Sequence, residues 1–531
     1  MKTTRILALV LALMLVTMLA PVTAGAENFN AEGYPVCPDE KVTLRVMIQT
    51  RAEMPSDLNE QYVQQKAEEL MNVHIEWIQV PADAWEEKKN LMLATGDLPD
   101  IIESHIQDSD LTRYGPDGTF IDLTDLLANY AHNFNAIVAN ELPDLKTFIT
   151  APDGKIYSMC RVNSGPWMTT NGVGVMNKAW LQKLGLEEPK TLDDFTNVLR
   201  AFKTGDPNGN GQADEIPLCF DKYMFNNFGV GYIMSFFGLA ISSQDQVGSF
   251  ADVKDGKVYC QATTDEYRDA VKYLGQLYSE GLIDPEVFTL SEAELFSKLN
   301  QDPCVVGVTQ MWDINDSIST PQNNEDYDYY KMVSAYEGKD PVFYRNPLPG
   351  TVRAWGMVTS ACKYPEVAVR WLDYWFDPDN SIESIEGPIG VRVLENGDGT
   401  LYVRTPPEGM SVAEDRFANC RAGILAATPS IYANRLKLPS TAEKVAFVQE
   451  FCHPFADPDP MMPVFYTAEE AEEIGTMYKE MNDFIVGSTA KMIRDNNVDE
   501  AWDSYVSAMN TQYLPTWLQI NQAAYDRYMG K

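Results

Sequence analysis

The chain has 531 residues, of which 45% are hydrophobic, and its formal net charge is −36 at pH 7. A globular chain of this length exceeds a comfortable single hydrophobic core, so we expect two lobes. The negative charge repels nucleic acid and anionic membranes, and it therefore disfavours both as partners.

The N-terminus has the pattern of a secretory signal peptide. Lys2 and Arg5 precede an apolar run over residues 6–20, and Ala24-Gly25-Ala26 provides the small side chains of a cleavage site. We therefore expect residues 1–26 to be removed near Ala26 and the mature protein to be exported to the periplasm or the cell surface. No cysteine stands at the predicted cleavage point, so no lipid anchor is predicted there.

The first hundred mature residues alternate between two kinds of element. Strands are predicted at 41–49, 74–80 and 97–103, with helices at 60–71 and 85–94 between them. This alternation is typical of an α/β fold. Ligands of open α/β sheets bind beyond the carboxyl ends of the strands, so we predict that Gln49 and His105 contact a ligand. A solvated loop position is an equally good interpretation of His105.

Tryptophans in loops or at strand ends are candidate flat platforms for a sugar ring. Trp167 follows a predicted loop, Trp312 ends a predicted strand over 303–311, and Trp355 lies within another strand. For each of them, packing in the core is as good an interpretation. Trp371 and Trp375 are four residues apart on a predicted helix, and we assign both to packing.

Several threonines mark the beginnings of predicted helices. Thr191 and Thr264 are predicted N-caps, and Thr467 opens a capping box with Glu470. In the helix after Thr264, aromatic and aliphatic residues recur at helical spacing, which indicates a buried face. The C-terminal third is predicted to be mostly helical.

The stretch Asp206–Glu215 resembles the first part of a calcium-binding EF-hand loop. Oxygen-bearing side chains stand at relative positions 1, 3, 5, 9 and 10, and Gly211 occupies position 6, where such a loop turns sharply. Pro217 stands at position 12, so the usual closing glutamate is missing. We predict a structural Ca²⁺ site; the predicted ligands are Asp206, Asn208, Asn210, Gln212 through its carbonyl, Asp214 and Glu215. An Asn/Gly-rich turn without metal is the alternative.

Other metal and disulfide chemistry is weakly indicated. The eight cysteines are scattered without a C-x-x-C pair, and the chain has four histidines, so the spacing of zinc ligands is absent. The cysteines are compatible either with disulfides or with buried thiols.

Several stretches together resemble a known family. They include residues 90–102 (NLMLATGDLPDII), 180–186 (WLQKLGL), 189–195 (PKTLDDF) and the 206–215 loop, followed by 371–378 (WLDYWFDP) and 522–528 (QAAYDRY). The chain is similar over its whole mature length to the large carbohydrate-type extracellular solute-binding proteins of ABC importers, in the LplA-like and alginate-binding branch.

This resemblance implies a two-lobed, periplasmic-binding-protein-like (type II) α/β fold with hinge crossings and a helical C-terminal region. It divides the chain into 27–170 for the first lobe, 171–350 for the second, 351–410 for a return to the first, and 411–531 mostly for the second. Relatives in this branch hold Ca²⁺ in the matching loop, and many carry a lipobox cysteine that is missing here.

The implied function is non-catalytic: a monomer captures an oligosaccharide and delivers it to ABC permease subunits in the membrane. Sugars need polar contacts as well as aromatic platforms, and we predict Asn226 and Arg345 as further contacts. A secreted glycoside hydrolase would need two facing carboxyl groups, and no acidic pair is marked out by its context. A sugar-sensing partner of a membrane receptor is a further alternative.

Overall fold

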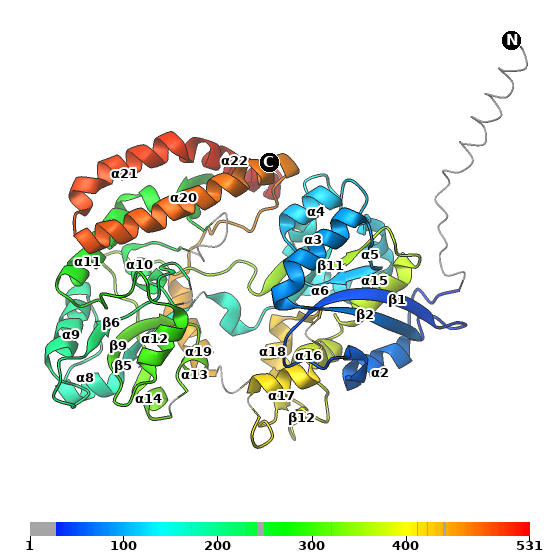
Figure 1. Cartoon of the computed structure of the whole chain (residues 1–531), viewed down its shortest axis with the longest axis horizontal. Helices are drawn as coiled ribbons and strands as arrows, with labels where there is room; N and C mark the ends of the chain where they lie inside the picture. The colour runs from blue at the N-terminus through cyan, green and yellow to red at the C-terminus, as the bar shows by residue number, and fades with distance from the viewer. Residues whose placement is uncertain are drawn as a thin grey trace, which may run out of the picture.

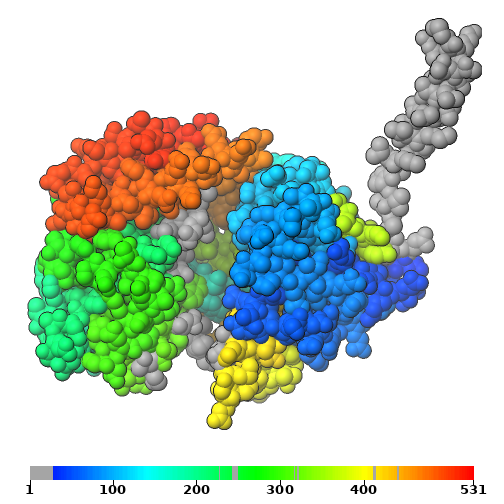
Figure 2. Space-filling view, viewed as in Figure 1, coloured from blue at the N-terminus to red at the C-terminus, as the bar shows by residue number. Residues whose placement is uncertain are grey.

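The computed structural model describes residues 28–531, except for 171, 227, 242–248, 320, 411, 422 and 439–441. The predicted signal peptide at residues 1–26 lies outside this range. Figure 1 shows two bodies side by side, and Figure 2 shows that the surface is hollowed between them.

The first body is built on a six-stranded mixed sheet. Its strands lie in the order β14 (Ala426–Ala427), β4 (Met159–Asn163), β11 (Thr351–Val358), β3 (Ile101–Glu103), β1 (Val42–Thr50) and β2 (Val73–Pro81). β1 pairs in parallel with β2 and β3, whereas β11 runs antiparallel to β3 and β4. The three strands predicted between residues 41 and 103 are thus confirmed, with the third shorter than predicted.

Helices surround this sheet. They are α2 (Tyr62–Met71), α3 (Trp85–Thr95), α4 (Asp108–Tyr114), α5 (Thr124–Tyr130), α6 (His132–Asn140), α7 (Asp144–Ile149), α15 (Pro365–Tyr374) and α16 (Pro378–Glu386). Trp371 of α15 and Trp375, which caps the end of this helix, are fully buried, with ring centroids 5.8 Å apart. Their predicted role in packing is confirmed.

A small three-stranded sheet adjoins the first body. It comprises β12 (Val393–Glu395), β13 (Leu401–Val403) and β15 (Leu436–Lys437), with α17 (Val412–Asn419) and α18 (Pro429–Asn434) nearby. β14 also comes from the segment 411–531, which we expected mostly in the second lobe. It pairs with β4 instead, so this segment contributes to both bodies.

The second body contains a four-stranded sheet in the order β10 (Tyr327–Tyr329), β5 (Val173–Asn177), β9 (Val306–Met311) and β6 (Ile216–Leu218). A hairpin of β7 (Ala251–Lys254) and β8 (Lys257–Cys260) belongs to the same body. Its helices are α8 (Lys178–Leu184), α9 (Leu192–Thr204), α10 (Gly231–Met234), α11 (Asp265–Ser279), α12 (Glu292–Leu299), α13 (Ile314–Ser317), α14 (Pro321–Asp326) and α19 (Ala442–Phe447).

Three long C-terminal helices cover the top of the second body: α20 (Ala468–Asp495), α21 (Val498–Gln512) and α22 (Leu514–Tyr528). α20 packs on α11, and its other neighbours include α4 of the first body. The predicted caps are confirmed, because Thr191, Thr264 and Thr467 each accept a hydrogen bond from a first-turn amide. None of the helices in the described residues combines the length and apolar character that crossing a membrane requires.

A buried ion pair fastens β3 to the segment that leads into β14. Glu103 and Arg421 are both fully buried and hydrogen-bonded to each other. The other oxygen of Glu103 accepts from the amide of Ile424 at 2.7 Å, and the Arg421 guanidinium lies 4.1 Å from the Trp375 ring centroid. Removing one partner would leave a buried charge without compensation.

We therefore expect Glu103→Gln to lower the free energy of unfolding by about 3–5 kcal/mol, measured by urea denaturation. Asp495→Asn is a matched control, because it removes the partner of Arg494 in an exposed pair and should cost less than about 1 kcal/mol. Equal effects of the two substitutions would contradict a structural role for the buried pair.

Candidate functional site

The two main sheets turn one edge toward each other. β1, β3 and β4 run in the same direction, so their carboxyl ends lie along one edge of the first sheet. In the second sheet, the carboxyl ends of β6, β9 and β10 lie beside the start of β5. The segment 164–172 joins β4 to β5 and the segment 330–350 joins β10 to β11, so both cross between these edges.

Hydrogen bonds join these crossings to residues 453–455, which lie between α19 and α20. Thr169 Oγ1 lies 3.1 Å from His453 Nε2, and the amide of Asn346 donates to the carbonyl of Thr169 at 3.0 Å. The amide of Phe343 donates to the carbonyl of Phe455 at 2.7 Å. Burial, together with the positive charge of Arg345, lowers the pKa of His453.

Two predicted polar contacts lie at the edge of the first sheet. Gln49 is half-buried near the end of β1, and its backbone N–H donates to Ser104 Oγ at 2.8 Å. His105 is exposed just beyond β3, and its carbonyl accepts from the indole of Trp85 at 3.1 Å. Both side chains thus lie where the strand pattern predicts them.

Two of the predicted tryptophans also lie on this side. Trp167, in the short helix η3 (Pro166–Thr169), packs edge-on against Tyr432 with ring centroids 4.7 Å apart. The hydroxyl of Tyr432 donates to Asn163 Oδ1 at 2.6 Å, which fixes the ring beside the end of β4. Trp355 is half-buried on the neighbouring strand β11, and its indole nitrogen is buried without an acceptor among the described residues.

Cationic side chains gather beside Trp355. The guanidinium of Arg161 lies 4.8 Å from the Trp355 ring centroid. Arg51 and Arg416 both lie over the ring of Phe417, at 4.7 and 5.6 Å. Burial lowers the pKa of Arg161 to about 10, and the charges of Arg416 and Arg51 act in the same direction.

The third predicted tryptophan belongs to the second body. Trp312 follows β9 and is half-buried, and the ammonium of Lys444 lies 3.8 Å from its ring centroid. α19, which carries Lys444, contacts η3, which carries Trp167. The structure therefore brings Trp312 and Trp167 to the same region from opposite bodies.

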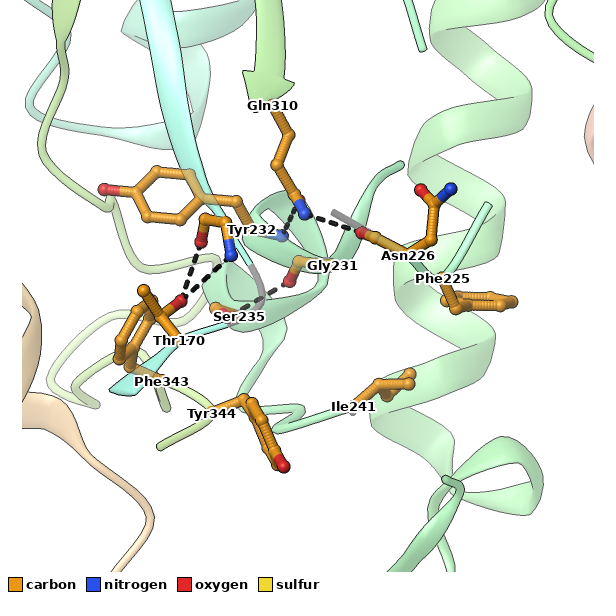
Figure 3. Close-up of a pocket in the computed structure, with 11 residues that line it drawn as sticks. Thr170, Phe225, Asn226, Gly231, Tyr232, Ser235, Ile241, Gln310, Phe343 and Tyr344 are labelled. Carbon is orange, nitrogen blue, oxygen red and sulfur yellow. Dashed lines mark hydrogen bonds between the residues drawn. The ribbon is translucent and has the colours of Figure 1, made fainter. Parts of the chain in front are cut away.

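A pocket at the edge of the second sheet contains the predicted Asn226 (Figure 3). Gln310 fixes its wall: its oxygen accepts from the amide of Tyr232 at 2.6 Å, and its nitrogen donates to the carbonyl of Asn226 at 2.9 Å. The amide side chain of Asn226 donates to buried Asp221 at 2.9 Å. Burial raises the pKa of Asp221 to about 6. The hydrogen bonds of this wall join protein groups to one another, so the wall is formed without a ligand.

The crossing segments contribute the last predicted contact. Arg345 is exposed on the crossing 330–350, next to Tyr344, which lines the pocket. The predicted ligand-binding residues therefore fall on the two facing edges and on the two crossings between them, which carry Trp167 and Arg345.

The predicted calcium loop lies apart from these edges, between α9 and β6. Asp206 has a positive φ of 47° and accepts from the amides of Gly209 and Gly211. The side chains of Asn208 and Asn210 each donate to Asp214, at 2.9 Å. Five of the predicted side chains thus belong to one hydrogen-bonded turn or adjoin it.

One buried carboxylate oxygen of this loop has no hydrogen-bond donor among the described residues. This atom is Glu215 Oε1, and burial followed by the charges of Asp214 and Asp206 raises the pKa of Glu215. In the described part of the chain, no group of three or more His, Cys, Asp or Glu side chains is placed to hold a metal ion. The three carboxylates of the predicted set, those of Asp206, Asp214 and Glu215, are therefore not gathered into such a group in this structure.

The eight cysteines are free thiols, and seven of them are buried. The sequence was compatible either with disulfides or with buried thiols, and the structure has thiols.

The sequence alone did not single out Arg161, Tyr432 or Gln310. Arg161 had a usable signal, because it is the one charged residue in the strand Met-Cys-Arg-Val-Asn that ends at the edge. Tyr432 lies far from β4 in the chain, and no local pattern connects the two.

Comparisons with known proteins agree with this architecture. The family model described as bacterial extracellular solute-binding protein matches residues 56–382. The fructooligosaccharide ABC transporter substrate-binding protein FusA of Streptococcus pneumoniae serotype 4 is 32% identical over 536 residues, which cover 96% of this chain and 94% of FusA.

Two solved structures extend the comparison. That of FusA in complex with kestose has a TM-score of 0.78 and covers 92% of this chain and 99% of FusA. The alginate-binding protein AlgQ2 without calcium ion is 21% identical, covers 93% of this chain and 100% of AlgQ2, has a TM-score of 0.66, and supports the fold alone.

The family match, the FusA-like α/β fold with its C-terminal helices and the similarity along nearly the whole chain lead to one conclusion: this chain belongs to the bacterial extracellular solute-binding protein family, as a non-catalytic substrate-binding component of an ABC importer.

Proposed function

We propose that this protein captures a fructooligosaccharide between its two bodies and, as a monomer, delivers it to the permease subunits of its importer. The observation that carries this proposal is the similarity to FusA, which extends over 96% of the chain. FusA has been solved in complex with kestose and, as an EF-hand mutant, with fructo-nystose.

The chemistry of the two edges supports a sugar ligand. A sugar ring offers an apolar face for an aromatic side chain and hydroxyl groups for polar ones. The edge of the first body supplies Trp167 and Trp355 with Gln49 and His105, and the second body supplies Trp312 and Asn226. Arg345 on the crossing completes the proposed contacts.

The crossings support a closing motion of the two bodies. We propose lobes at residues 27–170 with 351–410 and at 171–350, with 411–531 shared between them as β14 indicates. A few backbone positions in the crossings would absorb the rotation, as in other hinged binding proteins. A ligand that contacts both bodies would favour the closed state, because only that state offers every contact at once.

We expect kestose to raise the melting temperature of the purified protein. Binding to the native state alone stabilises it by about 1.4 kcal/mol for each tenfold excess over Kd. Differential scanning fluorimetry gives the shift, and chromatography of the sugar after incubation should recover intact kestose. Unchanged melting with kestose and nystose would contradict the proposed ligand, and release of fructose would contradict a non-catalytic role.

We also propose that the loop 206–215 holds a structural Ca²⁺. The residues fit the ion because Glu215 Oε1 is buried without a donor, while the oxygens of Asp206, Asn208, Asn210 and Asp214 gather around the same turn. Gln212 would contribute its carbonyl. The ion would neutralise the carboxylates and stiffen the link between α9 and β6.

We expect calcium to stabilise the protein and EGTA to reverse the effect. At a hundredfold excess over Kd the gain is about 2.7 kcal/mol, measured as a shift in melting temperature. Asp214→Ala should abolish the calcium-dependent part of the shift, because Asp214 is predicted to close the site.

Asp398→Asn is a matched control, since Asp398 is an acceptor in an exposed turn elsewhere, where it bonds Thr400. It should keep the full calcium response. An Asp214→Ala variant that responds to calcium like the wild type would contradict the site.

A further inference from the structure

Arg161 differs from the other deeply placed arginines of the protein. Arg353 pairs with Asp108, Arg392 pairs with Glu386 and Asp415, and Arg421 pairs with Glu103. Buried Arg370 has no ion pair but donates to the carbonyls of Ala31 and Gly33. By contrast, half-buried Arg161 forms neither an ion pair with a described carboxylate nor a side-chain hydrogen bond to a described residue; its Nε is buried without an acceptor, as is that of Arg421. A desolvated donor without an acceptor lowers stability, so the position has a cost that packing alone does not explain.

The surroundings add to this cost. Arg51 and Arg416 meet at the ring of Phe417 and act on Arg161 with like charge. Arg416 has only a distant carboxylate partner, Glu386, at 3.8 Å. A cationic patch thus exists within a chain of net charge −36, and in the described structure nothing acidic neutralises its centre.

The place of this patch points to a ligand. Arg161 lies on β4, two residues before the carboxyl end of the strand, and stacks on Trp355 of the next strand. Tyr432, whose hydroxyl binds Asn163 at that end, packs against Trp167. The unpartnered donor therefore stacks on one tryptophan, while the other packs on Tyr432 beside the end of the same strand.

We propose that Arg161 is a direct ligand contact that donates hydrogen bonds to the oxygens of a saccharide unit held against the edge of the first body. Arg51 and Arg416 extend its preference, because the patch favours electron-rich oxygens and repels protonated amino groups. This inference rests on the proposed function and refines it: the preferred ligands are neutral or acidic saccharides, and glucosamine oligomers are excluded.

The test is Arg161→Met, because methionine keeps an apolar side chain on the Trp355 ring and removes every donor and the charge. Isothermal titration calorimetry is carried out on the full mature protein with kestose, nystose, trigalacturonic acid and the glucosamine trimer. We expect at least tenfold weaker binding by the variant of whichever saccharide the wild type binds, and no binding of the glucosamine trimer by the wild type.

Arg113→Met is the matched control. Arg113 is exposed on α4 of the same body and stacks on Tyr114 at 5.1 Å, and it is not among the predicted ligand contacts. It should bind like the wild type. The melting temperature of ligand-free Arg161→Met should not fall, because the substitution removes a half-buried charge that has no carboxylate partner. A purely structural arginine would give the opposite pattern, with a lower melting temperature and unchanged affinity.

The outcomes separate this inference from the proposed ligand. If the wild type binds trigalacturonic acid but not kestose, and Arg161→Met loses that binding, the inference stands and the fructooligosaccharide proposal fails. If Arg161→Met binds its saccharide within twofold of the wild type, or if the wild type binds the glucosamine trimer, the inference is overturned. Binding of none of the four sugars would overturn both.

Discussion

The arrangement of the protein depends on a few hydrogen bonds that hold its crossing segments together. Thr169 on the first crossing is hydrogen-bonded to both His453 and Asn346, and the backbone of Phe343 is hydrogen-bonded to that of Phe455. These contacts place the edge of one sheet opposite the edge of the other, and every predicted ligand contact lies on those edges or on a crossing. The α20–α4 contact, together with Arg353, whose guanidinium donates to the carbonyl of Pro463 at 2.7 Å, joins the same two bodies a second time. In the proposed closing motion, the two bodies would therefore rotate about the hydrogen-bonded crossing segments. The α20–α4 contact and the Arg353–Pro463 hydrogen bond would have to shift or persist during that rotation.

Charge is distributed unevenly within this frame. Among the buried arginines away from the edges, Arg353, Arg392 and Arg421 are paired with carboxylates, and Arg370 donates to backbone carbonyls. Burial in a low-dielectric interior requires such partners. At the edge of the first body, Arg161 stacks on Trp355, and Arg51 and Arg416 stack on Phe417, with little compensation by carboxylates. The second body offers the opposite arrangement, a wall whose polar groups are already bonded, from Gln310 through Asn226 to Asp221. In the proposed complex, the first body would thus offer free hydrogen-bond donors to the ligand, and the second body would offer a preorganised polar surface.

Local sequence patterns accounted for most elements and for few contacts. Alternation and capping predicted β1, β2 and the beginnings of α9, α11 and α20, because these depend on neighbouring residues. The burial of Trp371 and Trp375 followed from helical spacing. Strand direction sufficed to place Gln49 and His105 near an edge. The partnership of Tyr432 with Asn163, or of Lys444 with Trp312, joins residues more than a hundred positions apart, and no local pattern encodes it. For the same reason no local pattern indicates that β14, within a segment predicted to lie mostly in the second lobe, pairs with β4.

Closure around a ligand held by both bodies is the central claim, and solution X-ray scattering tests it most directly. The radius of gyration of the mature protein should decrease when saturating kestose is added, and it should not change with a sugar that calorimetry shows to be unbound. A radius of gyration that stays constant while calorimetry shows kestose to be bound would contradict capture between the two bodies.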